Sequence, residues 1–255
     1  MRTKVRYGLL LVLISLTAGA QPVTAVFEEG LQLEKNFKVE DALSKYQQVI
    51  KRQPDHTLAL THASRMLTNI GGRLGADHKE EKKKYYEQAK AYAAKALSLD
   101  STIVDTHLAY LIALGLLTEV ASSAGERVHD AKIIKHEAET IIRIDSTFGA
   151  GYFVLGKWHL EVSKLNWLER VACQLFFGGL PEASVDLAIS YLKKASRLEP
   201  NTILYLYGEA SAYEYEGDKK TAASLLKKAI ALPPKEPDDI QRKQRCEELL
   251  KDLNN

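Results

Sequence analysis

The chain has 255 residues, with 35 Lys and Arg against 33 Asp and Glu, so its formal net charge is +2. Three of the basic residues, Arg2, Lys4 and Arg6, lie before residue 20, and the remainder of the chain is close to neutral. This balance excludes the strongly basic surface expected of a nucleic-acid-binding protein. Two cysteines, Cys173 and Cys246, are too few for a disulfide scaffold; they could pair in an oxidising compartment, or serve as small buried apolar residues.

Residues 1–20 have the order of a secretory signal peptide. Basic residues come first, an apolar run follows, and small residues lead to Ala20. The apolar run is shorter than the roughly 20 residues of an ordinary membrane span. We therefore expect cleavage after Ala20, with Ala25 as second choice, and an exported protein, either periplasmic or secreted. The alternative is a protein anchored in a membrane through residues 7–20.

From there to the C-terminus, apolar residues recur at three- and four-residue spacing, and no segment alternates as a strand would. This pattern predicts an all-α fold. Near the C-terminus "AISYLKKASRLEP", from Ala188, returns 34 residues later as "AASLLKKAIALPP", from Ala222. The same template fits, with decreasing similarity, from Ala42, from Ala89 and from Ile134.

This 34-residue period is the tetratricopeptide pattern of paired antiparallel helices. Positions i, i+4 and i+7 lie on one helical face, and small residues there let two helices approach closely. A proline then ends the second helix of a pair. The prolines in that position are Pro54, Pro200 and Pro234. The pattern also places a close-contact glycine in the first helix of a pair, at Gly30 and Gly156, and Trp158 is expected to pack in the core.

Repeats two to four are longer than the 34-residue period, and the extra residues fall between the paired helices. The extra segments are approximately "NIGGRLGADHKEEKKK", "LTEVASSAGERVHDA" and "VSKLNWLERVACQLFFGGLPE". We interpret "GGRLG" as flexible, since no strand precedes it and no Lys-Ser/Thr follows it as in a phosphate-binding loop. In the third segment, apolar residues at helical spacing predict a short amphipathic helix that Gly178 and Gly179 end.

The last part of the chain predicts a helix that covers the open end of the array. Residues 237–253 follow Pro234 and begin with Pro237, which suits a first helical turn, and then Asp238 and Asp239, which suit the positive end of a helix. A solenoid needs such a cap over its last apolar face. We expect one tetratricopeptide-like domain over residues 21–255, with about five helix pairs and this capping helix.

The third insertion and the helix after it resemble the regulator of microtubule dynamics family. The matching residues are Leu155-Gly156-Lys157-Trp158, Leu165, Trp167, Glu169-Arg170, Phe177-Gly178 and Pro181. The likeness is good over residues 150–253 and weaker over 60–149, and Lys157 stands where the family has Arg. It implies a helical array without catalytic activity; animal members are linked to microtubules and to organelle membranes, and related secreted proteins occur in bacteria. With its cleavable leader, this chain is expected to be an exported bacterial relative.

No set of residues indicates catalysis, a metal site or a cofactor, and we expect a protein that is not an enzyme. The serines lack a nucleophile elbow. His129 and His136 could share a helical face but fall short of the three or four ligands that zinc needs, so we expect them in solvent. His107 and His159 are expected to be hydrogen-bonded core residues.

The function predicted from this pattern is that of a binding scaffold for a protein or peptide partner. In tetratricopeptide arrays the first helix of each pair lines the concave surface where such ligands lie. The residues projected onto that surface are Arg65, Asn69, Asp105, Leu108, Phe153, Lys157, Glu161, Tyr207, Ser211, Glu214 and Tyr215. The lysine-rich run "HKEEKKK" could instead meet an acidic membrane surface, although Glu80 and Glu81 oppose this.

Overall fold

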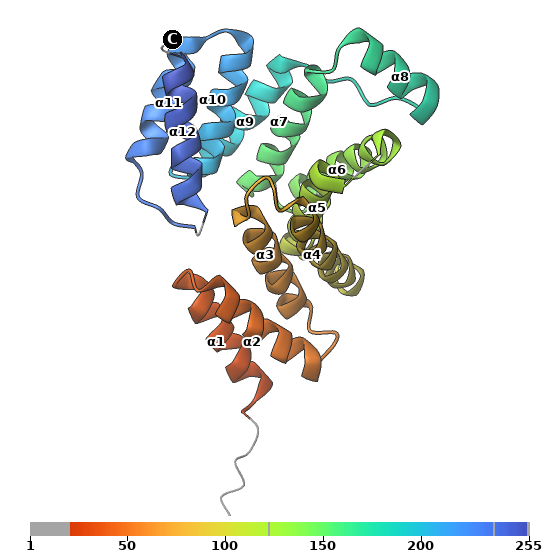
Figure 1. Ribbon diagram of the computed structural model, residues 1–255, viewed down its shortest axis with the longest axis vertical. Helices are drawn as coiled ribbons and strands as arrows, with labels where there is room; N and C mark the ends of the chain where they lie inside the picture. The colour runs from red at the N-terminus through yellow and green to blue at the C-terminus, as the bar shows by residue number, and fades with distance from the viewer. Residues whose placement is uncertain (1–20, 122, 237, 254–255) are drawn as a thin grey trace, which may run out of the picture.

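A computed structural model describes residues 21–121, 123–236 and 238–253, and within these ranges every element is a helix (Figure 1). The helices are α1 (Val23–Lys35), α2 (Val39–Arg52), α3 (Thr57–Arg73), α4 (Lys79–Leu99), α5 (Val104–Ala121), α6 (Ala124–Ile144), α7 (Gly149–Ser163), α8 (Trp167–Phe177), α9 (Val185–Leu198), α10 (Ile203–Glu216), α11 (Lys219–Ala231) and α12 (Asp239–Leu253). The all-α tetratricopeptide fold predicted from the sequence is confirmed. The predicted signal peptide, residues 1–20, lies outside the described residues.

The helices pack as antiparallel pairs that stack along the chain. The pairs are α1 with α2, α3 with α4, α5 with α6, α7 with α9, and α10 with α11. Helix α12 packs on α11 and α10 and covers the last apolar face, where Cys246 is fully buried. Figure 1 shows α1 and α2 at one end of this array and α11 and α12 at the other.

Small residues on the second helix of each pair make this stacking possible. The repeat positions Ala42, Ala89, Ala188 and Ala222 are completely buried. Opposite them lie glycines with no room for a side chain. A Cβ on Gly30 would come within 2.6 Å of the Tyr46 ring, and a Cβ on Gly156 within 2.5 Å of Leu192 Cγ. Trp158 is buried beside Gly156 and donates from Nε1 to the Ala131 carbonyl at 2.8 Å.

The first insertion corrects our interpretation of "GGRLG" as flexible. Helix α3 continues to Arg73 and includes Gly71, whose missing side chain leaves space for the ring of Tyr86. A Cβ on Gly71 would lie 2.5 Å from Tyr86 Cε1, which is the same arrangement as Gly30 with Tyr46. The composition of this segment suggests a loop, but packing against α4 stabilises it as a helix up to Arg73.

The third insertion forms α8, the short amphipathic helix that the apolar spacing predicted. An Asn166–Glu169 capping box begins it, and Gly178 ends it in the left-handed conformation at φ 70°. Helix α8 packs only lightly on α6 and projects from the array (Figure 1). None of its residues is buried.

Two further observations concern membranes and cysteines. None of the helices in the described ranges has the length and apolar character to cross a membrane. Cys173 and Cys246 are unpaired. Burial raises the pKa of the Cys246 thiol to about 11, so this residue behaves as a small apolar core group.

Candidate functional site

The candidate site is the inner surface, by which we mean the side of the array bearing Arg65 of α3, Glu119 of α5, Lys157 to Lys164 of α7, Tyr215 of α10 and Arg245 of α12. At its centre, Lys157 and Lys164 both donate to Oε1 of Glu161, at 2.9 and 3.0 Å. The ammonium group of Lys164 also lies 5.8 Å from the centre of the Tyr215 ring, which joins α7 to α10. Burial would raise the pKa of Glu161, but the two lysines outweigh it and the pKa is lowered.

Glu119 of α5 is affected by charged groups on α7 and α12. Burial raises the pKa of Glu119 on α5, while the positive charges of Lys157 on α7 and Arg245 on α12 lower it in part. Glu161 raises the pKa of Glu119 as well, because the two carboxylates repel each other. Three helices distant in sequence thus bring their charged side chains within electrostatic reach of one another.

A second polar cluster lies on the N-terminal side of the inner surface, around Glu34. This carboxylate accepts the Tyr46 hydroxyl at 2.7 Å and lies 2.7 Å from Nδ1 of His62 and 3.5 Å from Arg65. Burial would raise the pKa of Glu34, but His62 and Arg65 together reverse the effect and the pKa is lowered. The cluster links α1, α2 and α3, and Arg65 remains partly exposed.

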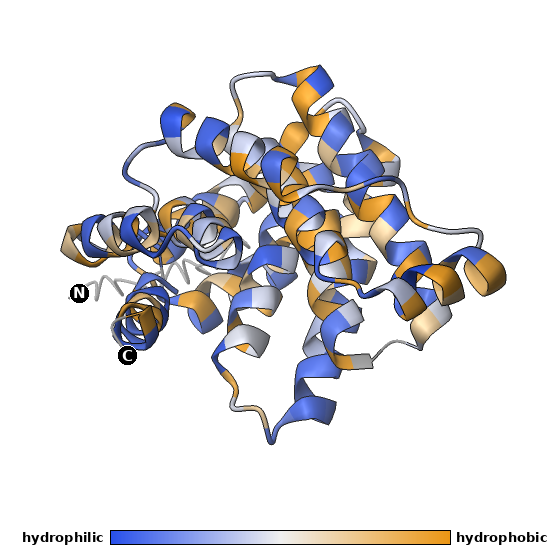
Figure 2. Ribbon diagram, turned by 90° about the horizontal axis from the view of Figure 1, so that it is seen from above, coloured by the Kyte–Doolittle hydropathy of each residue, from blue (hydrophilic) through white to orange (hydrophobic). Residues whose placement is uncertain are grey.

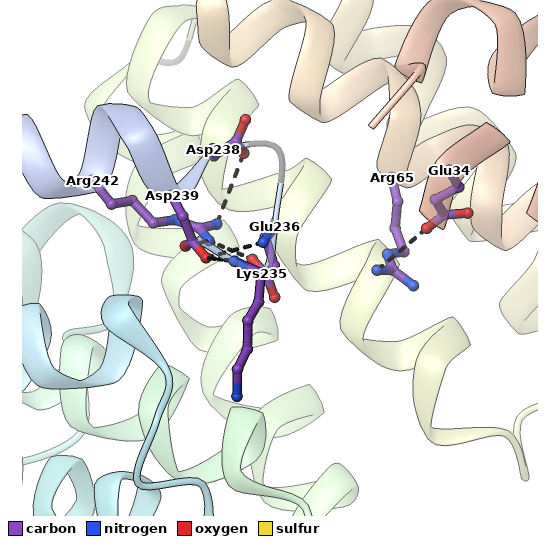
Figure 3. Close-up of polar contacts among 7 residues, drawn as sticks. All are labelled: Glu34, Arg65, Lys235, Glu236, Asp238, Asp239 and Arg242. Atoms are coloured by element: carbon purple, nitrogen blue, oxygen red, sulfur yellow. Dashed lines mark hydrogen bonds and ion pairs between the residues drawn. The ribbon is translucent and has the colours of Figure 1, made fainter. Parts of the chain in front are cut away.

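The third cluster forms where the chain enters α12. Arg242 pairs with Glu236, with Asp239 at 2.9 Å and with Asp238 at 3.8 Å. Asp239 in turn accepts the backbone N–H groups of Lys235 and Glu236, which fixes the turn (Figure 3). Burial raises the pKa of Asp238, and the positive charges of Arg242 and then Arg73 of α3 lower it in part.

Two of the residues projected onto the concave surface pack against neighbouring parts of the array. The ring of Phe153 stacks on Tyr205 with 5.1 Å between ring centres and fills the space beside Gly208, so it packs between helices. Tyr207 is half-buried against the C-terminal core. The helical spacing gives the face of α7 that bears Phe153, but how closely α10 approaches that face depends on Gly208, where a Cβ would lie 2.6 Å from the Phe153 ring.

The remaining projected residues differ in exposure. Arg65, Asp105, Glu161, Glu214 and Tyr215 are exposed, whereas Asn69, Leu108, Lys157 and Ser211 are half-buried. Leu108 packs against the core around Ala150, so it is not a contact residue. Glu34, Glu119 and Arg245 were not predicted from the sequence, because their partners lie on other helices and no local pattern marks them.

The histidines differ in their surroundings. His107 is buried and bonded to Glu137 and, at 2.9 Å, to the Ser101 carbonyl, as expected. His159 is buried and stacks on Tyr191, but its Nδ1 has no hydrogen-bond partner, so the expectation of a hydrogen-bonded ring was wrong for this residue. His129 and His136 are exposed. Across the described ranges, no group of three or more His, Cys, Asp and Glu could hold a metal ion.

The fold and the inner surface define a tetratricopeptide-type helical scaffold. Among solved structures, a thermophilic TPR protein of Thermus thermophilus is similar over 90% of this chain and 100% of its own, with a TM-score of 0.67 and 15% identity. A tetratricopeptide repeat protein of Parabacteroides merdae covers 94% of this chain and 74% of its own, with a TM-score of 0.59 and 15% identity. At this identity the likeness shows the fold alone.

The sequence relatives are more specific. The family model described as regulator of microtubule dynamics protein 1-3 matches residues 26–254, and the chain belongs to that family. Regulator of microtubule dynamics protein 1 of Bos taurus is 26% identical over 94% of this chain and 75% of its own. The Caenorhabditis elegans protein 1 is 23% identical over 85% and 96%. Protein 3 of Xenopus laevis is 29% identical over 69% of this chain, which spans only 38% of that longer protein.

These relatives correct the expected localisation. We expected an exported bacterial relative, periplasmic or secreted. The matching proteins are instead animal proteins named as regulators of microtubule dynamics, and microtubules lie inside cells. The prediction of export was therefore wrong. It relied on the order of residue types in residues 1–20, and other N-terminal segments can share that order.

Proposed function

We propose that this chain is a non-enzymatic scaffold that binds a protein or peptide partner on its inner surface. The observation that carries the proposal is the convergence of Glu119, Lys157, Glu161, Tyr215 and Arg245 from four helices. A surface of mixed charge with an exposed tyrosine suits a polypeptide, whose side chains can exchange ion pairs with it. The tetratricopeptide fold supports this, since such arrays present extended binding surfaces.

The partner that we propose to test first is the microtubule. Family membership is the reason, because the related animal proteins carry microtubule regulation in their names. The inner surface offers both cations and anions, so binding is expected to weaken as salt screens these charges. Association with an organelle, which the family resemblance also implies, is an alternative within this same proposal.

The test is co-sedimentation with polymerised microtubules, using a double variant of the full chain, Lys157→Ala with Tyr215→Ala. Tyr215 is exposed and the Lys157 side chain is 38% exposed, so the fold should persist, while each true contact should cost about 2 kcal/mol of binding free energy or more. Tyr207 is unsuitable for this purpose because it packs on the core. The matched control is Lys227→Ala with Leu187→Ala, which truncates an exposed lysine of α11 and a residue of α9 that is as exposed as Tyr215, at 45%.

Wild type and control should co-sediment while the double variant stays in solution. Equal binding by wild type and double variant would exclude the inner surface. If no form of the protein binds microtubules, affinity capture from a cell extract with the same three proteins separates the two parts of the proposal. A partner held by wild type and control but lost by the double variant would support the scaffold and exclude the microtubule.

A further inference from the structure

Helix α8 leaves a large apolar face in contact with solvent. The exposed fractions are 72% for Trp167, 68% for Leu168, 72% for Leu175 and 74% for Phe176. Figure 2 shows the helix as a largely hydrophobic element at the edge of the molecule. Val171 and Ala172 lie between these residues on the same side of the helix and are half-buried. The largest apolar patch on a soluble monomer often marks an interaction site.

The helix is held in place without using this face. Its opposite side faces the array: the Phe177 carbonyl accepts from Lys132 at 3.0 Å, and the Phe177 ring lies beside Gly125 of α6. The guanidinium group of Arg170 donates to the carbonyls of Leu165 and Val162, each at 3.0 Å, and so ties α8 to the end of α7. The contacts that attach α8 to α6 and α7 therefore leave its apolar face unused.

The charges around α8 restrict what can cover the face. Glu169 is used in the capping box, and Arg170 binds the carbonyls at the end of α7, so the apolar face itself carries no charge. Residues 164–187 contain two basic and three acidic side chains. Helices that lie in a bilayer surface usually have a polar face rich in Lys and Arg, and this one does not. An uncharged face can, however, meet its own copy across a two-fold axis without bringing like charges together.

The size of the face also fits a weak contact between copies. Two aromatic and two leucine side chains on an 11-residue helix present on the order of 500 Å², below the roughly 800 Å² per partner of a standard stable interface. We propose that α8 pairs with α8 of a second copy of this chain, antiparallel and about a two-fold axis near Val171 and Ala172. This antiparallel arrangement sets Trp167 of each copy beside the Leu175–Phe176 end of the other.

The first test is the oligomeric state of the full chain, by sedimentation velocity from about 1 to 200 µM, a range suited to a weak interface. We expect a reversible monomer–dimer equilibrium that Leu175→Gln weakens at least about 10-fold. The matched control is Ile240→Gln, since Ile240 is 64% exposed but stands on α12. The helical content of all three proteins should agree, because both side chains are largely in solvent. A wild type that stays monomeric throughout, or a Leu175→Gln variant that dimerises as well as wild type, would overturn the proposal.

Disulfide cross-linking tests the geometry. In a Cys173→Ser background, Val171→Cys lies near the proposed axis and should cross-link to its own copy under mild oxidation. Trp167→Cys should not, because antiparallel helices place the two copies of residue 167 far apart. Cross-linking at 167 but not at 171 would overturn the arrangement. Flotation of monomeric wild type with phosphatidylcholine vesicles, lost in Leu175→Gln, would assign the face to a bilayer and likewise overturn the proposal.

Discussion

The inner surface and helix α8 differ in the side chains that they expose and in what fixes their positions. On the inner surface, charged groups such as Lys157 and Glu161 are neutralised within the chain, and the positions of their helices depend on contacts between repeats. Helix α8 is shaped by local signals at its two ends, and it leaves its apolar residues without cover. One chain can therefore carry two kinds of surface. The residues of the inner surface are positioned by packing between repeats, whereas α8 is positioned by capping residues at its own ends.

The largest expected effect comes from breaking the packing that positions the inner surface. Gly156→Leu would bring a Cβ within 2.5 Å of Leu192 Cγ and push α7 from α9, at a cost of about 1–3 kcal/mol or more. Thermal unfolding should show a melting temperature lower by several degrees. The control is Gly72→Ala in α3, where no atom lies within 4 Å of the new Cβ, and which should stabilise by up to about 1 kcal/mol. Unchanged melting of Gly156→Leu would mean that the two helices are not in close contact.

The next effect concerns the charge cluster of α1 to α3. Glu34→Gln removes the charge that Tyr46, His62 and Arg65 stabilise, and should lower the free energy of unfolding by about 1–2 kcal/mol at pH 7. The pKa of Glu34 is lowered in the folded state, so its contribution is present above about pH 4.5 and is lost as the pH falls through the folded pKa. Denaturant titrations should therefore show the two proteins converging in acid, and a difference that does not depend on pH would contradict this.

A smaller effect is expected at the start of α8. Asn166→Ala removes the side chain that accepts the Glu169 N–H at 3.0 Å, and such a loss costs a helix about 1 kcal/mol. Amide hydrogen exchange should become faster in the first turn of α8 and stay unchanged in α7 and α9. Faster exchange throughout the array would show that α8 is part of its core.

The smallest effect is predicted for Glu119, whose pKa is raised in the folded state. The ionised carboxylate is disfavoured there, so its penalty is present above the folded pKa and absent below the ordinary value of about 4.5. Glu119→Gln should leave stability at pH 7 unchanged or raise it by no more than about 0.5 kcal/mol, as measured by urea unfolding. A clear loss would show that the ionised group is held by stronger partners than Lys157 and Arg245.

The sequence was sufficient for those features that local spacing determines. The repeat of small residues at Ala42, Ala188 and Ala222 predicted the paired helices, and the apolar spacing with Gly178 predicted α8 and its end. The sequence was insufficient where a residue distant along the chain determines how a side chain or segment packs. Gly208 determines the placement of Phe153, and Tyr86 determines that "GGRLG" is helical up to Arg73. The charge pairs of the inner surface join residues such as Glu34 and His62, 28 positions apart, which no periodicity connects.

The most direct test of the inner surface is the footprint of a bound partner on the full chain. Hydrogen exchange should be measured with and without microtubules, or with the captured partner, at a protein concentration low enough to keep the chain monomeric. We expect slower exchange in residues 157–164 of α7 and 207–216 of α10, and no change in α8. Slower exchange confined to α8, with α7 and α10 unaffected, would contradict it and would make the apolar helix the site of partner binding.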